Sequence, residues 1–114
     1  MAFKEKVLED LGSFLPEKAF LLNEEATLRQ AGGLHTEEPV NAKLIVRPKS
    51  TEEVSKILAV CNREKQPVVV HGGLTGLVYG TRTLPDQLIL SLERMNEIDE
   101  VDVVGRTLTC QSGA

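Results

Sequence analysis

Glycines that directly follow a run of valines are the residues of this sequence best suited to bind a ligand. The run is Val68-Val69-Val70, and the glycines after it are Gly72, Gly73, Gly76 and Gly80. Glycine lets backbone N–H groups come close to a ligand. Several N–H groups that converge in one loop bind an anion, most often a phosphate. The spacing predicts a loop for a phosphorylated cofactor, although spacing alone leaves a plain wide turn as the alternative.

Two common nucleotide-binding motifs do not match this loop. The P-loop ends in Gly-Lys followed by Ser or Thr, but here Gly76 is followed by Leu77 and no lysine is close. The dinucleotide motif Gly-x-Gly-x-x-Gly opens a helix, whereas the residues after Gly80 are Thr-Arg-Thr-Leu-Pro, which do not continue as one. Both of these nucleotide folds are disfavoured.

The composition gives little support to other ligand classes. The net charge of −4 argues against nucleic acid, whose binders usually present a basic patch. His35 and His71 have no partners at metal-ligand spacing, so we predict no metal site and expect His35 to be a surface residue. Cys61 and Cys110 are expected to be buried thiols. No apolar run approaches the roughly 20 residues that span a bilayer, and the N-terminus lacks a signal-peptide core. We therefore predict no membrane segment and a cytoplasmic location.

The elements before the glycine loop predict a βαβ unit. Leu44-Ile45-Val46 predicts a short buried strand, and Ser50 with Glu53 predicts a capping box for a helix that ends near Lys65. The expected apolar face of that helix consists of Val54, Ile57, Leu58 and Cys61. Val68–Val70 is then a second buried strand, and a right-handed crossover makes the two strands parallel. The glycine loop would follow the carboxyl end of a parallel strand, where α/β folds place their ligands.

The rest of the chain predicts shorter elements. An amphipathic helix covers residues 3–15 and ends near Gly12 or Ser13, a short element covers 19–22, and Asn23 caps a helix over 24–30 before a polar loop from Gly32 to Asn41. Downstream we expect a turn at 85–86, a buried strand over 88–90, a helical turn over 92–96, and a hairpin with strands over 98–104 and 107–110 joined by Gly105-Arg106. Because the chain stops where a new turn begins, we expect an incomplete domain.

Four motifs, taken in this order, resemble the N-terminal FAD-binding region of the vanillyl-alcohol oxidase/p-cresol methylhydroxylase (PCMH) flavoproteins. The motifs are Leu44 to Val54, Pro67 to Leu77, Leu88 to Ser91 with Arg94-Met95-Asn96, and Cys110 to Gly113. Within that family the chain is most similar to the FAD-linked D-2-hydroxy acid dehydrogenases, which include D-lactate dehydrogenase, the glycolate oxidase FAD subunit and D-2-hydroxyglutarate dehydrogenase. The resemblance begins near residue 40 and runs to the end of the chain.

The resemblance implies an α+β fold that is the first part of a PCMH-type FAD-binding domain: a βαβ unit of short parallel strands, then a β-hairpin. Residues 1–39 would be an N-terminal helical segment and loop, and residues 40–114 would be the first part of the FAD-binding domain. FAD would be bound without a covalent bond, its diphosphate wrapped by backbone N–H groups and by the Thr75 hydroxyl. The implied cofactor-binding residues are Pro48, His71, Gly72, Gly73, Leu74, Thr75, Gly76, Leu77, Ser112 and Gly113.

Two residues of the loop depart from the pattern of that family. Leu74 stands where the family usually has glycine, alanine or asparagine, and Tyr79 stands where it usually has a small residue. A leucine can still offer its backbone N–H, but its side chain must point away from the cofactor. The Tyr79 side chain is expected to crowd the loop.

The resemblance also implies a function for the parent protein. FAD would accept a hydride from a D-2-hydroxy acid and yield the 2-oxo acid, but no residue of this chain can be assigned as catalytic base or as the cation that holds the carboxylate. We therefore expect no turnover from the chain alone. One alternative is a truncated flavin domain that binds nothing tightly, and another is a different branch of the family, acting on alcohols, sugars or cell-wall precursors. An exposed hairpin edge would favour self-association.

Overall fold

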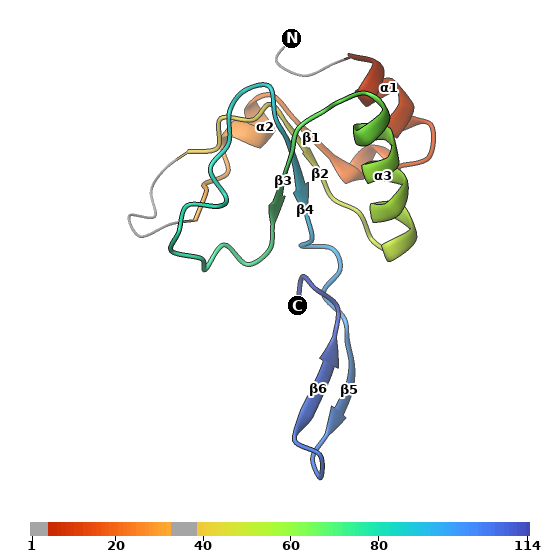
Figure 1. Ribbon diagram of the computed structural model, residues 1–114, viewed down its shortest axis with the longest axis vertical. Coiled ribbons are helices and arrows are strands. Elements are labelled where there is room, and N and C mark those ends of the chain that lie inside the picture. Colours follow the sequence, from red (N-terminus) through yellow and green to blue (C-terminus); the bar gives the residue numbers. More distant parts are fainter. Residues whose placement is uncertain (1–4, 33–38) are drawn as a thin grey trace.

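The computed structural model describes residues 5–32 and 39–114, which form a sheet with helices on it and a long hairpin that extends from it (Figure 1). The expected surface position of His35, the start of the first helix at residue 3 and most of the predicted polar loop lie outside the described residues. Within the described ranges, no helix is long and apolar enough to cross a membrane.

One four-stranded mixed sheet organises the chain. Its strands are β1 (Phe20–Leu22), β2 (Leu44–Val46), β3 (Val68–His71) and β4 (Leu88–Ser91), in the order β1-β2-β4-β3. β2 and β3 are both parallel to β4, which lies between them, while β1 is antiparallel to β2. The predicted parallel direction of the two strands that flank the long helix is thus confirmed.

In the described part of the chain, four helical segments accompany the sheet. They are α1 (Glu5–Gly12), the 3-10 helix η1 (Glu17–Ala19), α2 (Glu24–Thr27) and α3 (Thr51–Arg63). Ser50 caps α3 as predicted, because Glu53 N donates to Ser50 Oγ at 3.2 Å. The return bond of the predicted capping box is displaced by one residue, since the Glu53 carboxylate accepts from Lys49 N at 2.6 Å. α3 ends at Arg63, two residues before Lys65, near which its end was predicted, and Lys65 has a left-handed φ of 57° that does not continue a helix.

The second predicted helix differs more from expectation. α2 stops at Thr27 instead of Gln30, and Asn23 precedes it without a capping hydrogen bond from its side chain. Asn23 has φ 51°, outside the extended region that a capping residue normally adopts. The predicted cap is therefore wrong in mechanism, although Asn23 is the residue before the helix.

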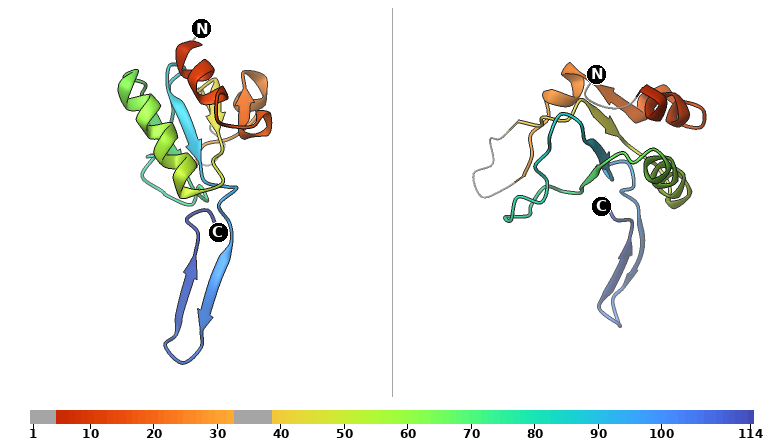
Figure 2. Two further views of the ribbon diagram at one scale, coloured as in Figure 1. Left: turned by 90° about the vertical axis from the view of Figure 1, so that its right-hand side faces the viewer. Right: turned by 45° about the horizontal axis from the view of Figure 1, so that its top comes forward.

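The sheet separates two apolar clusters. On one face, α1 and α3 lie side by side (Figure 2) and bury the strand residues that alternate toward them: Leu44, Val46, Leu88 and Leu90. On the other face, Ile45 and Ile89 pack against Ala26 of α2 and against Val40 and Ala42. The central strands β2 and β4 are buried on both faces, as their unbroken apolar sequences require.

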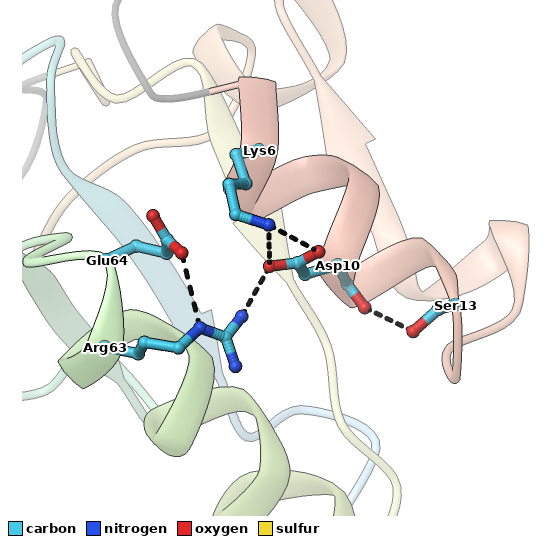
Figure 3. A network of polar contacts seen from close by, with 5 residues as sticks. All are labelled: Lys6, Asp10, Ser13, Arg63 and Glu64. Atoms are coloured by element: carbon cyan, nitrogen blue, oxygen red, sulfur yellow. Dashed lines mark hydrogen bonds and ion pairs between the residues drawn. The ribbon is translucent and has the colours of Figure 1, made fainter.

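Charged side chains join α1 to α3 above the first cluster (Figure 3). Asp10 lies 2.5 Å from Arg63 and 3.3 Å from Lys6, and Arg63 Nε donates to Glu64 at 3.3 Å. The Arg63 and Lys6 side chains are largely exposed, so such pairs contribute only about 0.2–1 kcal/mol each. The packing of the two helices therefore depends mainly on their apolar faces.

Three predictions of burial are wrong. Val68–Val70 is not a buried strand: β3 lies at the edge of the sheet, and Val70 is 52% exposed. Leu58 is 43% exposed, and Val60 takes the buried place on α3 instead. Cys61 is buried as expected, but Cys110 is exposed on the hairpin.

The hairpin projects from the sheet as an arm made of β5 (Ile98–Asp102) and β6 (Thr107–Cys110) (Figures 1 and 2). β5 ends two residues before the predicted Val104, because the Asp102 carboxylate accepts from Gly105 N at 2.9 Å and folds residues 103–106 into the turn. A bulge at Asp99 puts Ile98 opposite Cys110 and Val101 opposite Leu108. The register gives the arm one apolar face, and it is exposed.

The segment between β4 and the arm is a turn and not the expected helical turn. Its one internal backbone bond runs from Met95 N to the Leu92 carbonyl at 2.9 Å. The end of the chain packs on this turn, because Gly113 N donates to the Met95 carbonyl at 2.8 Å. The turn thus joins the sheet to the arm.

Candidate cofactor-binding site

The glycine loop begins where the sequence placed it, at the carboxyl end of a parallel strand. His71 is the last residue of β3 and pairs with Ser91 at the end of β4. From Gly72 to Gly80 the loop is mostly exposed, and it returns to the protein at Thr81. The backbone of this loop is accessible to a ligand over most of its length.

The glycines of the loop are not explained by the packing of the protein. A Cβ built on Gly72, Gly73, Gly76 or Gly80 would have no other atom within 4 Å, and none of these glycines has a left-handed φ. Neither a close approach of the chain nor its conformation therefore requires glycine there. The open space beside these N–H groups suits a ligand that must approach the backbone closely, as a diphosphate does.

The left-handed positions of the loop are occupied instead by residues with side chains. Leu74 has φ 60° and Tyr79 has φ 62°. This conformation costs roughly 1–2 kcal/mol for a residue that is not glycine, which explains why small residues suit these two positions. Leu74 and Tyr79 are thus strained at the very places where the sequence departs from the PCMH pattern.

Contacts from outside the loop hold this conformation. The carbonyl of Leu74 lies against Gly32, where any side chain would collide with it. The guanidinium of Arg82 lies 4.2 Å from the centre of the Tyr79 ring. His71 Nε2 lies 2.9 Å from the Thr81 carbonyl, across the two ends of the loop.

The His71 ring is buried and its environment favours the neutral form. Burial lowers the pKa of His71, while the hydrogen bond to the Thr81 carbonyl raises it less. The carbonyl can only accept, so Nε2 carries the hydrogen. The side chain reaches across the base of the loop to Thr81, and His71 also forms part of the wall of a groove at the start of the loop.

A groove of about 430 Å³ runs from the start of the loop across the ends of the central strands. Its walls include Gly72 and Leu74 of the loop, Ser91 and Glu93 after β4, and Arg29 after α2. Glu93 lies 3.3 Å from Arg29 and 3.9 Å from Arg47, so both signs of charge are present. A larger hollow of about 680 Å³ near α1 and β1 has no residue of the glycine loop in its wall.

The remaining predicted site residues lie apart from the loop. Pro48 is fully buried just after β2, with β4 between it and β3. Ser112 is exposed, and Gly113 packs on the turn after β4, where a Cβ would collide with the Leu92 carbonyl. The structure brings His71 to Leu77 together in one loop, while Gly113 already has a packing reason to be glycine.

Sequence reasoning missed Arg29, Glu93 and Thr81. Glu93 follows a predicted strand, so its place at the carboxyl edge could have been inferred. Arg29 and Thr81 gave no such signal, because only the tertiary fold brings Arg29 to Glu93 and Thr81 to His71. As for metals, the described residues contain no group of three His, Cys, Asp or Glu side chains that could hold an ion.

A strand-end glycine loop on a small mixed sheet defines a cofactor-binding domain, and comparison with known proteins identifies its family. The profile of the family described as "FAD binding domain" matches residues 42–114. This chain belongs to the FAD-binding domain family, and its cofactor is FAD. The earlier resemblance to FAD-linked oxidoreductases related to D-2-hydroxy acid dehydrogenases is confirmed.

The curated relatives include several 2-hydroxy acid enzymes. A probable D-2-hydroxyglutarate dehydrogenase of Oryza sativa subsp. indica is 47% identical over 73 residues, which are 64% of this chain and 13% of the relative. The glycolate oxidase subunit of Escherichia coli is 43% identical over 70 residues, 61% of this chain and 14% of the relative. A D-2-hydroxyglutarate–pyruvate transhydrogenase of Saccharomyces cerevisiae is 35% identical over 92% of this chain and 20% of its own length. The chain thus spans a fifth or less of these relatives.

Solved structures show the same fold. A variant of the grass pollen allergen Phl p 4, a glucose oxidase, superposes with a TM-score of 0.76 at 20% identity, over 96% of this chain and 24% of that one. p-Cresol methylhydroxylase gives a TM-score of 0.68 at 20% identity, over 85% of this chain and 20% of that one. The expected α+β, PCMH-type fold is confirmed, and the match covers part of that domain.

Proposed function

We propose that this chain is the FAD-binding part of a flavin-dependent oxidoreductase that converts a D-2-hydroxy acid to the 2-oxo acid. The observation that supports the site is the set of loop glycines whose Cβ positions are open and whose φ angles do not require glycine. The similarity to D-2-hydroxyglutarate dehydrogenases and to a glycolate oxidase subunit supports the substrate class. FAD, when bound, supplies the hydride acceptor.

The residues from His71 to Leu77 would hold the diphosphate of FAD without a covalent bond. Backbone N–H groups of Gly72, Gly73 and Gly76 donate to it, and the exposed Thr75 hydroxyl is a further donor. Leu74 contributes its N–H, with its carbonyl turned toward Gly32. Pro48, Ser112 and Gly113 remain proposed neighbours of the flavin.

Titration of the chain with FAD tests the diphosphate site directly. Flavin fluorescence should fall to a plateau with a micromolar Kd, and riboflavin, which lacks the diphosphate, should bind far more weakly. Gly73→Val should raise the Kd of FAD at least about tenfold, because the side chain fills the space beside the N–H groups. Gly12→Val is the matched control, since its Cβ would also be in open space but lies at the end of α1.

The result that would refute this site is the absence of saturation with FAD. It would support the alternative, a flavin domain that binds no cofactor tightly. Equal affinities of the Gly73→Val and Gly12→Val variants would show that FAD binds elsewhere.

Catalysis by the chain alone is not expected. Oxidation of a hydroxy acid needs a base near the hydroxyl group and a cation for the carboxylate, and we assign neither role to residues of this chain. Purified chain with FAD, D-lactate or D-2-hydroxyglutarate and a dye acceptor should leave the dye oxidised. Dye reduction would contradict this, and reduction with glucose in place of the hydroxy acids would favour the sugar-oxidising branch.

We also propose that the arm associates with a second copy of the chain through β6. β5 contains three acidic residues, Asp99, Glu100 and Asp102, while β6 contains no charge. Charged residues protect a strand edge from pairing, so the neutral β6 edge is the more open one. Sedimentation should show concentration-dependent dimers that Thr109→Lys removes and Glu100→Gln retains. A monomer at all concentrations would refute the idea.

Two further predictions concern the whole protein. The division into segments 1–39 and 40–114 remains a prediction, and α1 and β1 of the first segment share the core of the second. A cytoplasmic location is likewise a proposal, and several relatives bear names that include "mitochondrial". Fluorescence microscopy of the tagged full-length protein would test it.

A further inference from the structure

The glycine loop contains two residues in a strained backbone conformation. Leu74 and Tyr79 both have left-handed φ angles of about 60°. Residues in such conformations relax unless their surroundings fix them. A device that fixes the loop before a ligand arrives would lower the cost of binding, because the loop would lose less freedom on binding.

His71 makes the contact that closes the loop. Its buried ring lies at the end of β3, and its Nε2 donates to the Thr81 carbonyl at 2.9 Å, ten residues further along the chain. One side chain therefore ties the first residue of the loop to the residue at which the loop returns. Because the carbonyl has only lone pairs to offer, this donor cannot serve a phosphate oxygen at the same time.

A second set of contacts supports the middle of the loop from the N-terminal segment. Thr81 Oγ1 donates to the Gly32 carbonyl at 3.3 Å. Gly32 is also the residue against which the Leu74 carbonyl lies, so closely that no side chain fits between them. Gly32 lies before residues 42–114, the part that matches the family profile. A residue outside that part thus helps to shape the cofactor loop.

We infer that His71 acts through its side chain as a positioning residue for the FAD diphosphate: the bond of its ring to Thr81, supported by the Thr81–Gly32–Leu74 contacts, preorganises the backbone N–H groups of the loop, and the ring itself does not bind the diphosphate. This inference rests on the proposed diphosphate site. It assigns a structural cause to the affinity for the diphosphate, while the flavin ring would be held by other residues. Loss of the His71–Thr81 bond should weaken the binding of FAD and leave the binding of riboflavin unchanged.

The matched control lies at the opposite end of the same strand. Gln66, also buried, donates from Nε2 to the Pro67 carbonyl at 3.0 Å and to the Asp86 carbonyl at 2.8 Å. It joins two segments through side-chain-to-backbone bonds, as His71 does, but it lies away from the glycine loop. Gln66→Met should lower stability without changing the ratio of FAD affinity to riboflavin affinity.

The test combines flavin titration with amide hydrogen exchange on four forms of the full chain. His71→Phe keeps a ring and removes the donor, so the Kd of FAD should rise about tenfold, the equivalent of about 1.4 kcal/mol. Amide exchange should accelerate at Arg82, whose N–H donates to the Tyr79 carbonyl at 3.2 Å where the loop returns, while β4 stays protected. His71→Gln, whose side-chain amide can donate to the Thr81 carbonyl, should restore most of the FAD affinity and most of the amide protection. Gln66→Met should leave the FAD affinity and the amide protection of the loop unchanged.

The outcomes separate this inference from the proposed function. If the wild type fails to bind FAD, the proposed diphosphate site is refuted, and exchange of the Arg82 amide in His71→Phe still decides whether His71 fixes the loop. If His71→Phe shows the same amide exchange and the same Kd of FAD as the wild type, the inference is overturned. If that variant fails to fold, Thr81→Val, which removes only the hydroxyl bond to Gly32, replaces it, with an expected rise in Kd of about threefold. No rise in that variant would overturn the inference as well.

Discussion

The two halves of the molecule bury their apolar residues to very different degrees. In the body, which comprises β1–β4 with α1 and α3, Leu88 is 0% exposed. In the arm, made of β5 and β6, Leu108 is also a leucine in a strand, but its side chain is 56% exposed. An isolated two-stranded hairpin is only marginally stable. The stability of this chain should therefore reside in the body, while the arm depends on its turn and on its attachment to the segment after β4.

Truncation of one leucine in each half gives the largest contrast. Leu88→Ala leaves a cavity between β2, β3 and the helices, and such changes cost about 2–5 kcal/mol of unfolding free energy. Leu108→Ala removes a side chain that is already in water, and exposed changes of this kind stay within about 0.5 kcal/mol. Urea unfolding followed by circular dichroism measures both. A loss of more than 2 kcal/mol in Leu108→Ala would show that the arm is packed in solution.

The contact between the end of the arm and the turn after β4 attaches the arm to the body, and its loss should give the next largest effect. Gly113 packs so closely on the turn after β4 that a Cβ would collide with the Leu92 carbonyl. Gly113→Ala should therefore lower the free energy of holding the arm on the body by about 1–3 kcal/mol, the range of overpacked sites. The loss is measured as faster amide exchange at residues 113 and 111, whose N–H groups donate to the Met95 and Glu97 carbonyls. Gly80→Ala is the control, because a Cβ there has no neighbour within 4 Å. Unchanged protection in Gly113→Ala would mean that the arm is held elsewhere.

What the sequence predicts well in this chain is local. The Ser50 cap of α3 and the apolar strand Leu44–Val46 each depend on residues a few positions apart, and both are present in the structure. The start of the glycine loop follows from the strand before it. These local features are present in the folded chain because tertiary contacts reinforce the local preferences instead of opposing them.

What the sequence does not predict depends on the order of strands and on distant partners. Val70 is apolar yet exposed because β3 is an edge strand, which the run of valines does not reveal. The hairpin boundary shifts because the Asp102 side chain competes for a turn amide. In the site, the left-handed φ of Leu74 has no local signal, and Gly32 and Thr81 meet the loop only in the folded chain.

A matched pair of side-chain caps gives the smallest and finest test of the contrast between body and arm. Ser50 Oγ accepts from Glu53 N at 3.2 Å in the body, and Asp102 Oδ1 accepts from Gly105 N at 2.9 Å in the arm. Ser50→Ala should lower the global unfolding free energy by about 1 kcal/mol, the usual cost of a lost helix cap. Asp102→Ala should speed amide exchange at residues 103–106 and change the global value by less than about 0.5 kcal/mol, because the arm can open while the body stays folded. Equal global losses in the two variants would show that body and arm unfold as one cooperative unit.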